Sequence, residues 1–379
     1  GEKLANLPTL KEDEKARDFY RNQLKSVVSA ACLAHDLGNP AFGHSGEEAI
    51  SKYFLDRVHD KGFRAAFTAG EWEDLTHFEG NANALRLLSR QFKGRMKGGL
   101  QMTYTTLASI LKYPCESLAR DKKKGKHRSK YGFFQDDQEV FEAIVREFPL
   151  ALDSEKPLAY RRHPFVYLVE AADDICYSII DYEDAHRLGI LSFEEVKDDF
   201  MRVLEQDPNT DMTRLGRNLE NLREDKNESV AYLRAKVINA LVQACADAFL
   251  ANQEVILKGD FSTSLLDSLK PYQNALKQIE KKSIGRIYNH DSVMKIELAG
   301  FKIMSGLIED FVEAALLAKD DRQKRHQKVL ALIPNQFQFE EEDRPYEKVM
   351  CILDFVSGMT DNYALELYRN LRGISVPGI

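Results

Sequence analysis

Along most of this chain, apolar residues recur at spacings of three and four, which is the period of an amphipathic helix. In residues 16–37, for example, Leu24, Val28 and Cys32 fall on one side of a predicted helix that ends at His35-Asp36. Further segments with this spacing predict helices over 45–57, 100–113, 135–148, 164–187, 193–205, 229–251, 262–280, 291–318, 322–332 and 345–372. The pattern therefore predicts an all-α protein.

Extended patterns are confined to two short pieces, residues 253–261 and 283–288. The arrangement of the helical segments predicts a compact helical domain over residues 1–190 and a C-terminal helical part over 191–379. We expect the second part to complete the pocket of the first and to supply oligomer contacts.

Composition places the chain among ordinary globular proteins. Hydrophobic residues make up 44 % of the 379 residues and charged residues 30 %, a normal balance for a protein with a large core. No apolar run approaches the roughly 18 residues that a membrane span needs, and no signal-peptide pattern opens the chain. The net charge of −7 gives no general attraction to nucleic acid.

The cysteines are odd in number and scattered through apolar surroundings, which predicts reduced thiols in a cytoplasmic protein. They are Cys32, Cys115, Cys176, Cys245 and Cys351.

The densest chemistry lies between residues 32 and 47. His35-Asp36 ends the first predicted helix, and His44 and Glu47 open the next one after a turn rich in glycine and proline. An adjacent His-Asp pair can offer an imidazole nitrogen and a carboxylate oxygen to one metal ion. A dipeptide this short also arises by chance, so a buried structural histidine beside a helix-end carboxylate is the alternative.

A second cluster of acidic residues lies on the helix predicted over 164–187. At about 100° per residue, Asp173, Tyr177, Asp181 and Asp184 fall within about 80° of one another. The segment is otherwise apolar enough to be buried. Buried carboxylates need a positive partner, so this face predicts a bound cation or pairing with Lys and Arg.

Residues 120–130 form a basic loop with seven lysine or arginine side chains, in the stretch Arg-Asp-Lys-Lys-Lys-Gly-Lys-His-Arg-Ser-Lys that ends at Lys130. A charge run of this kind is typical of a solvated, mobile loop. The aromatic residues after Lys130 leave a second interpretation open, in which the loop returns to a pocket.

Several motifs stand in a fixed order over most of the chain. They are His35-Asp36-Leu37-Gly38-Asn39-Pro40, Phe42-Gly43-His44-Ser45-Gly46-Glu47, His77-Phe78-Glu79-Gly80-Asn81-Ala82, Leu111-Lys112-Tyr113-Pro114, Arg162-His163-Pro164, Ala171-Ala172-Asp173-Asp174-Ile175-Cys176-Tyr177, Asp181 to Asp184, and Gly358-Met359-Thr360-Asp361 with Tyr363-Ala364. Together they resemble the HD-domain superfamily, and within it the deoxynucleoside triphosphate triphosphohydrolases, or dGTPase family.

The resemblance implies an HD-domain helical fold and metal-dependent hydrolysis of deoxynucleoside triphosphates. In this reaction water attacks the α-phosphorus, and the products are the deoxynucleoside and inorganic triphosphate. By the same resemblance His35, Asp36 and Asp173 bind the metal, and His44 and Glu47 form the catalytic pair. The implied substrate contacts are Lys112, Tyr113, Lys130, Tyr177, Asp181 and Asn81.

The residue chemistry fits these roles. Histidine exchanges a proton near neutral pH, and Glu47, three residues after His44, can fix the imidazole tautomer. A His and carboxylate ligand set accepts a divalent ion, Mg or Mn first, with Ni, Co, Fe and Zn also compatible. The resemblance further implies a homo-oligomer, commonly a hexamer, and leaves open a dNTP as allosteric activator and single-stranded DNA as a partner.

One feature departs from the family. Its metal set has four protein ligands, and the first is a histidine on an earlier helix, whereas no histidine precedes His35 here. We expect that helix to lie upstream of Gly1 and the chain as given to bind metal weakly.

Two other functions remain alternatives. The first keeps the HD site and acts as a nucleotidase or phosphodiesterase; Lys112-Tyr113 and Tyr177 argue against it because they suit a long phosphate chain. The second is an inactive nucleotide-sensing or nucleic-acid-binding regulator, favoured by the basic loop 120–130 and by the missing histidine.

Overall fold

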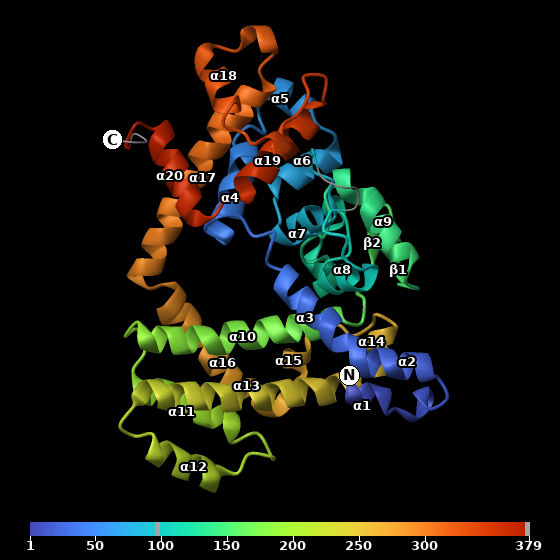
Figure 1. The fold of residues 1–379 in the computed structure, drawn as a ribbon, viewed down its shortest axis with the longest axis vertical. Helices are drawn as coiled ribbons and strands as arrows, with labels where there is room; N and C mark the ends of the chain where they lie inside the picture. The colour runs from blue at the N-terminus through green and yellow to red at the C-terminus, as the bar shows by residue number, and fades with distance from the viewer. Residues whose placement is uncertain (95–98, 376–379) are drawn as a thin grey trace. The chain divides into compact units, whose positions relative to one another are not determined.

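Helices form nearly all of the regular structure in the computed structural model of the chain, which describes residues 1–94 and 99–375 (Figure 1). The all-α class is confirmed. Among the described residues, no helix combines the length and apolarity needed to cross a membrane.

The chain folds into two compact units, and each unit combines two segments of sequence. Unit 1 contains Gly1–Val28 and His163–Met294, and unit 2 contains Ser29–Arg162 and Lys295–Ile379. The units therefore do not coincide with the halves 1–190 and 191–379. Residue 190 lies inside unit 1 because the helices on either side of it, α10 (Val166–Arg187) and α11 (Phe193–Leu204), both pack on α13 (Lys226–Ala251).

Unit 1 is built around α10 and α13, which run side by side (Figure 1). Ile175 and Ile179 of α10 belong to the same buried cluster as Leu233 and Val237 of α13. The other helices of this unit are α1 (Glu2–Ala5), α2 (Glu14–Asp18), the start of α3 (Leu24–Ala34), α12 (Met212–Asn221), α14 (Gln253–Leu257), α15 (Leu265–Ser268), α16 (Gln273–Lys282) and the start of α17 (Asp291–Leu316).

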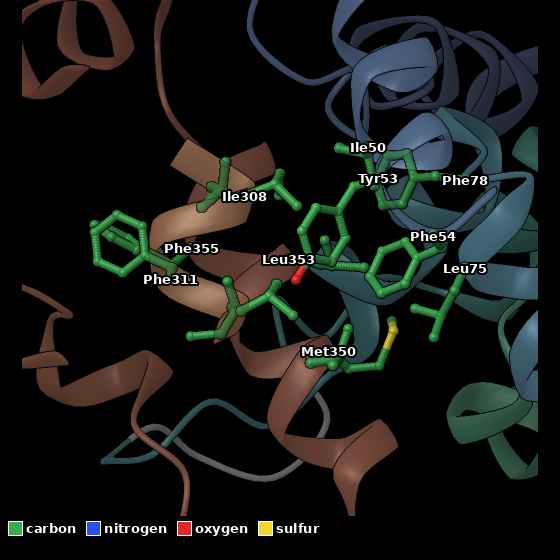
Figure 2. Packing of buried hydrophobic residues seen from close by; sticks show 14 of the residues in the cluster. Ile50, Tyr53, Phe54, Leu75, Phe78, Ile308, Phe311, Met350, Leu353 and Phe355 are labelled. Atoms are coloured by element: carbon green, nitrogen blue, oxygen red, sulfur yellow. The ribbon is translucent and has the colours of Figure 1, made fainter. Parts of the chain in front are cut away.

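Unit 2 holds a second core, shown in Figure 2. Ile50 and Phe54 of α4 (His44–Leu55) lie in one buried cluster with Ile308 of α17 and with Met350 and Leu353 of α19 (Pro345–Ser357). Its other elements are α5 (Lys61–Ala65), α6 (Ala69–Thr76), α7 (Gly80–Ser89), α8 (Tyr104–Ile110), α9 (Gln138–Arg146), β1 (Leu152–Glu155), β2 (Leu158–Tyr160), α18 (Lys324–Leu330) and α20 (Asp361–Leu371).

Short turns of other helix types join these elements. The 3₁₀ turns are Pro8–Leu10, Ser117–Ala119, Lys122–Lys124, Lys126–Arg128, Gln135–Asp137, Lys270–Tyr272, Lys319–Asp321 and Asn335–Phe337, and the π-helical turns are Phe19–Gln23 and Ser283–Tyr288.

A group of charged side chains in the core fixes α7 against α19; we call Arg86, Asp137 and Asp354 the core charge cluster. The Nε of Arg86 donates to Asp354 Oδ1 at 2.6 Å, and its Nη1 donates to Asp137 Oδ1 at 3.1 Å. All three side chains are buried. A buried charge without a partner lowers the stability of the folded protein. Removing one member of the core charge cluster should therefore destabilise the packing of α7 against α19.

The prediction of extended structure at residues 253–261 and 283–288 is wrong. Residues 253–257 form α14 and 283–288 form a π-helical turn, because Ile256 and Ile287 at these places join the apolar core of unit 1. The strands of the described residues lie elsewhere, in the antiparallel pair β1 and β2, where Leu152 is opposite Tyr160.

The single helix expected over 345–372 is in fact two. Helix α19 ends at Ser357, and the Thr360 hydroxyl starts α20 by accepting the N–H of Tyr363 at 3.3 Å. This break matters for the site, since it places Asp361 at the start of α20, where its carboxylate accepts the N–H of Phe42.

Candidate functional site

The segment with the densest chemistry follows directly on α3, as expected. His35 lies just beyond the end of this helix, and its Nδ1 is 2.7 Å from the carbonyl oxygen of Cys32. A carbonyl only accepts hydrogen bonds, so Nδ1 carries the proton and Nε2 keeps its lone pair, as a metal ligand must. Nε2 lies 3.4 Å from Asp36 Oδ1. His35 and Asp36 can therefore offer two ligands to one divalent ion.

The turn after Asp36 sits directly on the start of α7. A Cβ atom added to Gly38 would lie 2.0 Å from the carbonyl oxygen of Gly80, so only glycine fits there. Asn83 of α7 donates to the Gly38 carbonyl at 2.8 Å, and Asn39 donates to Asp36 Oδ1 at 3.0 Å. Backbone packing against α7 thus fixes the Asp36 carboxylate.

The second half of the turn sets the direction in which α4 begins. Phe42 and Gly43 both have positive φ, 63° and 57°, and Phe42 adopts this conformation although a side chain disfavours it. Its N–H donates to Asp361 Oδ1 at 2.9 Å. A residue from the start of α20 therefore holds the bend from which His44 begins its helix.

His44 and Glu47 form the hydrogen bond that their spacing predicted. Nδ1 of His44 lies 2.9 Å from Glu47 Oε2, and Glu47 Oε1 accepts the N–H of Gly80 at 2.7 Å. The His44 side chain is 87 % exposed and that of Glu47 only 12 %. The ring is thus open to a ligand while its orienting carboxylate is fixed in the protein.

The two groups shift each other's ionisation. The hydrogen bond that His44 donates to Glu47, opposed by partial burial, raises the pKa of His44 above its usual value. Burial opposes ionisation of Glu47, yet the bond to His44, the nearby charge of Lys130 and the Gly80 N–H together lower the pKa of Glu47. The pair therefore favours an imidazolium beside a carboxylate.

Asn81 and Lys130 meet at one carboxylate that the sequence analysis did not single out. Glu79 Oε1 accepts from Asn81 Nδ2 at 2.7 Å and from Lys130 Nζ at 3.0 Å. Glu79 is 6 % exposed; burial raises its pKa, and the charge of Lys130 acts in the opposite direction. We call His44, Glu47, Glu79 and Lys130 the site charge cluster.

Lys112 and Tyr113 lie on the segment next to Lys130. The Gly132 N–H donates to Cys115 O at 3.0 Å, and a Cβ at Gly132 would lie 2.4 Å from the Tyr113 carbonyl oxygen. Arg162 Nε donates to the carbonyl of Lys112 at 2.9 Å. These backbone contacts bring two distant motifs together.

The basic loop is anchored, so the interpretation as a solvated, mobile loop is wrong for its second half. His127 and Arg128 are buried, and both donate to Asp153 Oδ2 of β1, at 3.1 and 3.2 Å. Lys122, Lys123, Lys124 and Lys126 remain exposed. The alternative is correct in that Tyr131, Phe133 and Phe134 return to the interior.

Asp173, Tyr177 and Asp181 belong to α10 in unit 1. Tyr177 stacks on Tyr288 with ring centroids 5.5 Å apart, and the Tyr288 hydroxyl donates to Asp181 Oδ2 at 3.0 Å. Burial raises the pKa of Asp181 and the Tyr288 bond opposes this shift. The sequence analysis assigned Tyr288 no part in the site.

The expectation that this acidic face of α10 is buried is wrong. Tyr177 is 57 % exposed and Asp184 is exposed, while Asp173 and Asp181 are half-buried. The buried stripe of the helix runs instead through Ile175, Ile179 and Tyr182. The carboxylates therefore need no cation to offset burial, and a metal role for Asp173 has to be argued from its chemistry.

The structure thus places most of the predicted site residues in unit 2 and the rest in unit 1. Those of unit 2 are His35, Asp36, His44, Glu47, Asn81, Lys112, Tyr113 and Lys130, and those of unit 1 are Asp173, Tyr177 and Asp181. Their roles in metal and substrate binding stay predictions. Glu79 was within reach of the sequence, since it stands in the motif His77-Phe78-Glu79-Gly80-Asn81-Ala82, two residues before Asn81.

Comparisons with known proteins agree with this picture. A family described as the phosphohydrolase-associated domain matches residues 266–370. A deoxyguanosinetriphosphate triphosphohydrolase-like protein of Synechocystis is 38 % identical over 358 residues, covering 92 % of this chain and 78 % of the relative. A protein of the same description from Pseudomonas aeruginosa strain LESB58 is 32 % identical, covering 94 % and 79 %. A deoxyguanosinetriphosphate triphosphohydrolase of Yersinia enterocolitica is 28 % identical, covering 96 % and 83 %.

Proposed function

This chain belongs to the deoxyguanosinetriphosphate triphosphohydrolase family of the HD-domain superfamily, and on that premise we propose that it hydrolyses deoxynucleoside triphosphates, dGTP among them. The products are the deoxynucleoside and inorganic triphosphate. The observation that carries the proposal is the accessible His44, hydrogen-bonded to a partly buried Glu47 beside Lys130. An imidazole able to give a proton and an ammonium able to bind phosphate are what this cleavage requires.

We propose that His35, Asp36 and Asp173 hold a divalent ion, with Mg or Mn first and Ni, Co, Fe or Zn as alternatives. The donor set fits, because the Cys32 carbonyl fixes the His35 tautomer that keeps its lone pair on Nε2, and carboxylate oxygens suit each of these ions. When bound, such an ion polarises a phosphoryl oxygen and lowers the pKa of water.

The phosphate chain is bound by cationic and polar side chains. Lys112 and Lys130 offset its negative charge, and Tyr113 and Asn81 donate hydrogen bonds to its oxygens. Support comes from the shared backbone contacts of the 112–115 and 130–132 segments and from the position of Asn81 beside Lys130 on Glu79.

His44 supplies the proton that the leaving group needs. Water adds to the α-phosphorus and releases one proton to solvent, the bond from phosphorus to the 5′-oxygen breaks, and the imidazolium gives its proton to that oxygen. Glu47 holds the ring by its Nδ1–H and favours the charged form before the step. The spent imidazole regains a proton from solvent.

The sugar is recognised by α10. Asp181 accepts a hydrogen bond from the 3′-hydroxyl, and Tyr177 forms a flat wall that a 2′-hydroxyl would strike, which favours deoxyribose. The Tyr288 contacts support this assignment, because they fix the orientation of both side chains.

The proposal extends to the setting of the enzyme. The described cysteines are free, in keeping with a cytoplasmic protein. We propose a homo-oligomer such as a hexamer, a dNTP as activator and, on weaker support, single-stranded DNA as a partner. Light scattering after gel filtration, with and without each dNTP or an oligonucleotide, tests these assignments.

One experiment tests the activity. The chain is incubated with each dNTP and Mn or Mg and followed by phosphorus NMR. Released inorganic triphosphate is the expected result. Release of monophosphate or orthophosphate would indicate a nucleotidase instead, and absence of turnover by the metal-loaded protein would indicate a regulator.

A further inference from the structure

Glu79 occupies the centre of the site without a role in the proposed reaction. It is the residue before α7, and it is buried. Glutamate is not among the favoured helix-capping residues, and its bond to the Asn81 N–H is long, at 3.4 Å. Its bond to Lys130 Nζ is shorter, at 3.0 Å. A helix cap is therefore an incomplete explanation for a glutamate here.

The carboxylates of Glu79 and Glu47 flank one peptide unit. Glu47 Oε1 accepts the N–H of Gly80, the residue next to Glu79. The charge of Lys130 acts on both carboxylates, so one ammonium group is a counter-ion of the buried Glu79 and of the partly buried Glu47. Since a lysine side chain is long and flexible, it needs such a partner to keep its ammonium in one place.

We propose that Glu79 is a positioning residue: it holds the Lys130 ammonium beside the His44–Glu47 pair, where the phosphate chain binds, and affects the reaction only through Lys130. The inference rests on the proposed function and goes beyond it by giving a buried acid, rather than a base, a part in binding an anion. The Glu79 carboxylate repels the phosphate chain slightly. It still favours binding of the phosphate chain, because it orients the Lys130 ammonium.

Glu71 provides a matched control in the same unit. It too is buried, at 5 % exposed against 6 % for Glu79, and lies in the first turn of the neighbouring helix α6. It pairs with Arg344, whose Nη1 lies 2.7 Å from Glu71 Oε1. Glu71→Gln thus reports what losing a buried, paired carboxylate near a helix start does to folding alone.

The test is a double-mutant cycle on the full chain with dGTP, comparing Glu79→Gln, Lys130→Met and the combination. We expect Glu79→Gln to lower kcat/KM by about tenfold, mostly through KM. In the Lys130→Met background the same change should alter kcat/KM by less than about twofold, because the group it acts through is gone. Glu71→Gln should leave kcat/KM within about twofold of the parent.

Equal effects of Glu79→Gln with and without Lys130 would overturn the inference, as would an unchanged kcat/KM for Glu79→Gln alone. Fluorescence of Trp72, the only tryptophan, reports folding. Glu79→Gln could unfold because Lys130 is left unpaired; the double variant removes both charges and then serves as the test. If the double variant folds and its kcat/KM equals that of Lys130→Met, the inference is supported. If its kcat/KM is about tenfold lower than that of Lys130→Met, the inference is contradicted.

Calorimetry with inorganic triphosphate separates this inference from the proposed function. A parent protein that releases no triphosphate from any dNTP contradicts the function. Weaker binding of inorganic triphosphate to Glu79→Gln, absent in the Lys130→Met background, still supports the positioning role. Equal binding by the parent and Glu79→Gln contradicts that role even in an active enzyme.

Discussion

Two charge clusters meet helix α7, one through Arg86 within the helix and the other through Glu79, the residue before it. Both are built from ion pairs and hydrogen bonds, but they serve different purposes. In the core charge cluster, Arg86 is fully buried and donates hydrogen bonds to Asp137 and Asp354, which lie outside its own helix. In the site charge cluster at the N-terminal end, the cations are Lys130 and His44, and His44 is 87 % exposed. Arginine does not lose its proton, whereas histidine exchanges one near neutral pH. The first cluster can only hold the fold, and the second can take part in chemistry.

The largest effect should come from removing the proton donor of the site charge cluster. We expect His44→Ala to lower kcat by about 10²- to 10⁴-fold, the usual contribution of a general acid or base. The melting temperature should stay nearly unchanged, because the side chain is mostly exposed. Steady-state kinetics with dGTP and a thermal melt test both statements. Full activity would remove His44 from the mechanism.

The opposite pattern should follow when the core charge cluster is broken. Arg86→Met leaves the buried Asp137 without its cation and leaves Asp354 with Arg90 alone, whose Nη1 lies 2.9 Å from Asp354 Oδ2. This change should lower the free energy of unfolding by about 3–5 kcal/mol. Urea unfolding followed by Trp72 fluorescence measures this loss. Unchanged stability would mean that the aspartates are protonated or hydrated, and that the two clusters differ less than we infer.

A change at the junction with the turn should damage the site more than the fold. A Cβ at position 80 would lie 2.4 Å from Asn39 Oδ1 and 2.8 Å from Glu47 Oε1. Gly80→Ala should therefore displace Glu47 and the Asp36–Asn39 turn, with a loss in kcat/KM of about 10²-fold and a loss in stability of about 1–3 kcal/mol. Gly285→Ala is a control, since its Cβ would meet open space.

The smallest change is a shift in pH dependence. Because Glu47 raises the pKa of His44, activity that needs the imidazolium should fall as pH rises through a value above the usual one. In Glu47→Gln the negative partner is lost, so the pKa of His44 should fall and the alkaline limb of kcat should move to lower pH. A limb that stays in place would assign this ionisation to another group.

Local pattern predicted the fold class and the His44–Glu47 bond, because helical period and i, i+3 spacing are written in neighbouring residues. It placed His35 correctly at the end of α3. What it missed depends on partners distant in sequence. The anchoring of the basic loop needs Asp153, and the closeness of Gly38 to α7 appears only when the backbones are packed.

The errors have the same origin. Residues 253–257 and 283–288 look extended in isolation, but Ile256 and Ile287 join the core of unit 1 as parts of helical turns. The acidic face of α10 was expected to be buried because the whole segment is apolar. Which stripe of a helix is buried depends on its neighbours, here α13, and not on its own composition.

The hydrogen bond from the Phe42 N–H to Asp361 joins residues that are 319 positions apart in the sequence. The two residues are therefore synthesised at different times. Ser357, which hydrogen-bonds Asn83 at 3.1 Å, and Asp354 of the core charge cluster come equally late. At about 5–20 residues per second, the ribosome makes the 35–47 turn roughly 15–60 seconds before the residues that hold it in shape. During that interval a nascent chain carries His44 and Glu47 without the contact from Asp361 that holds the turn before them.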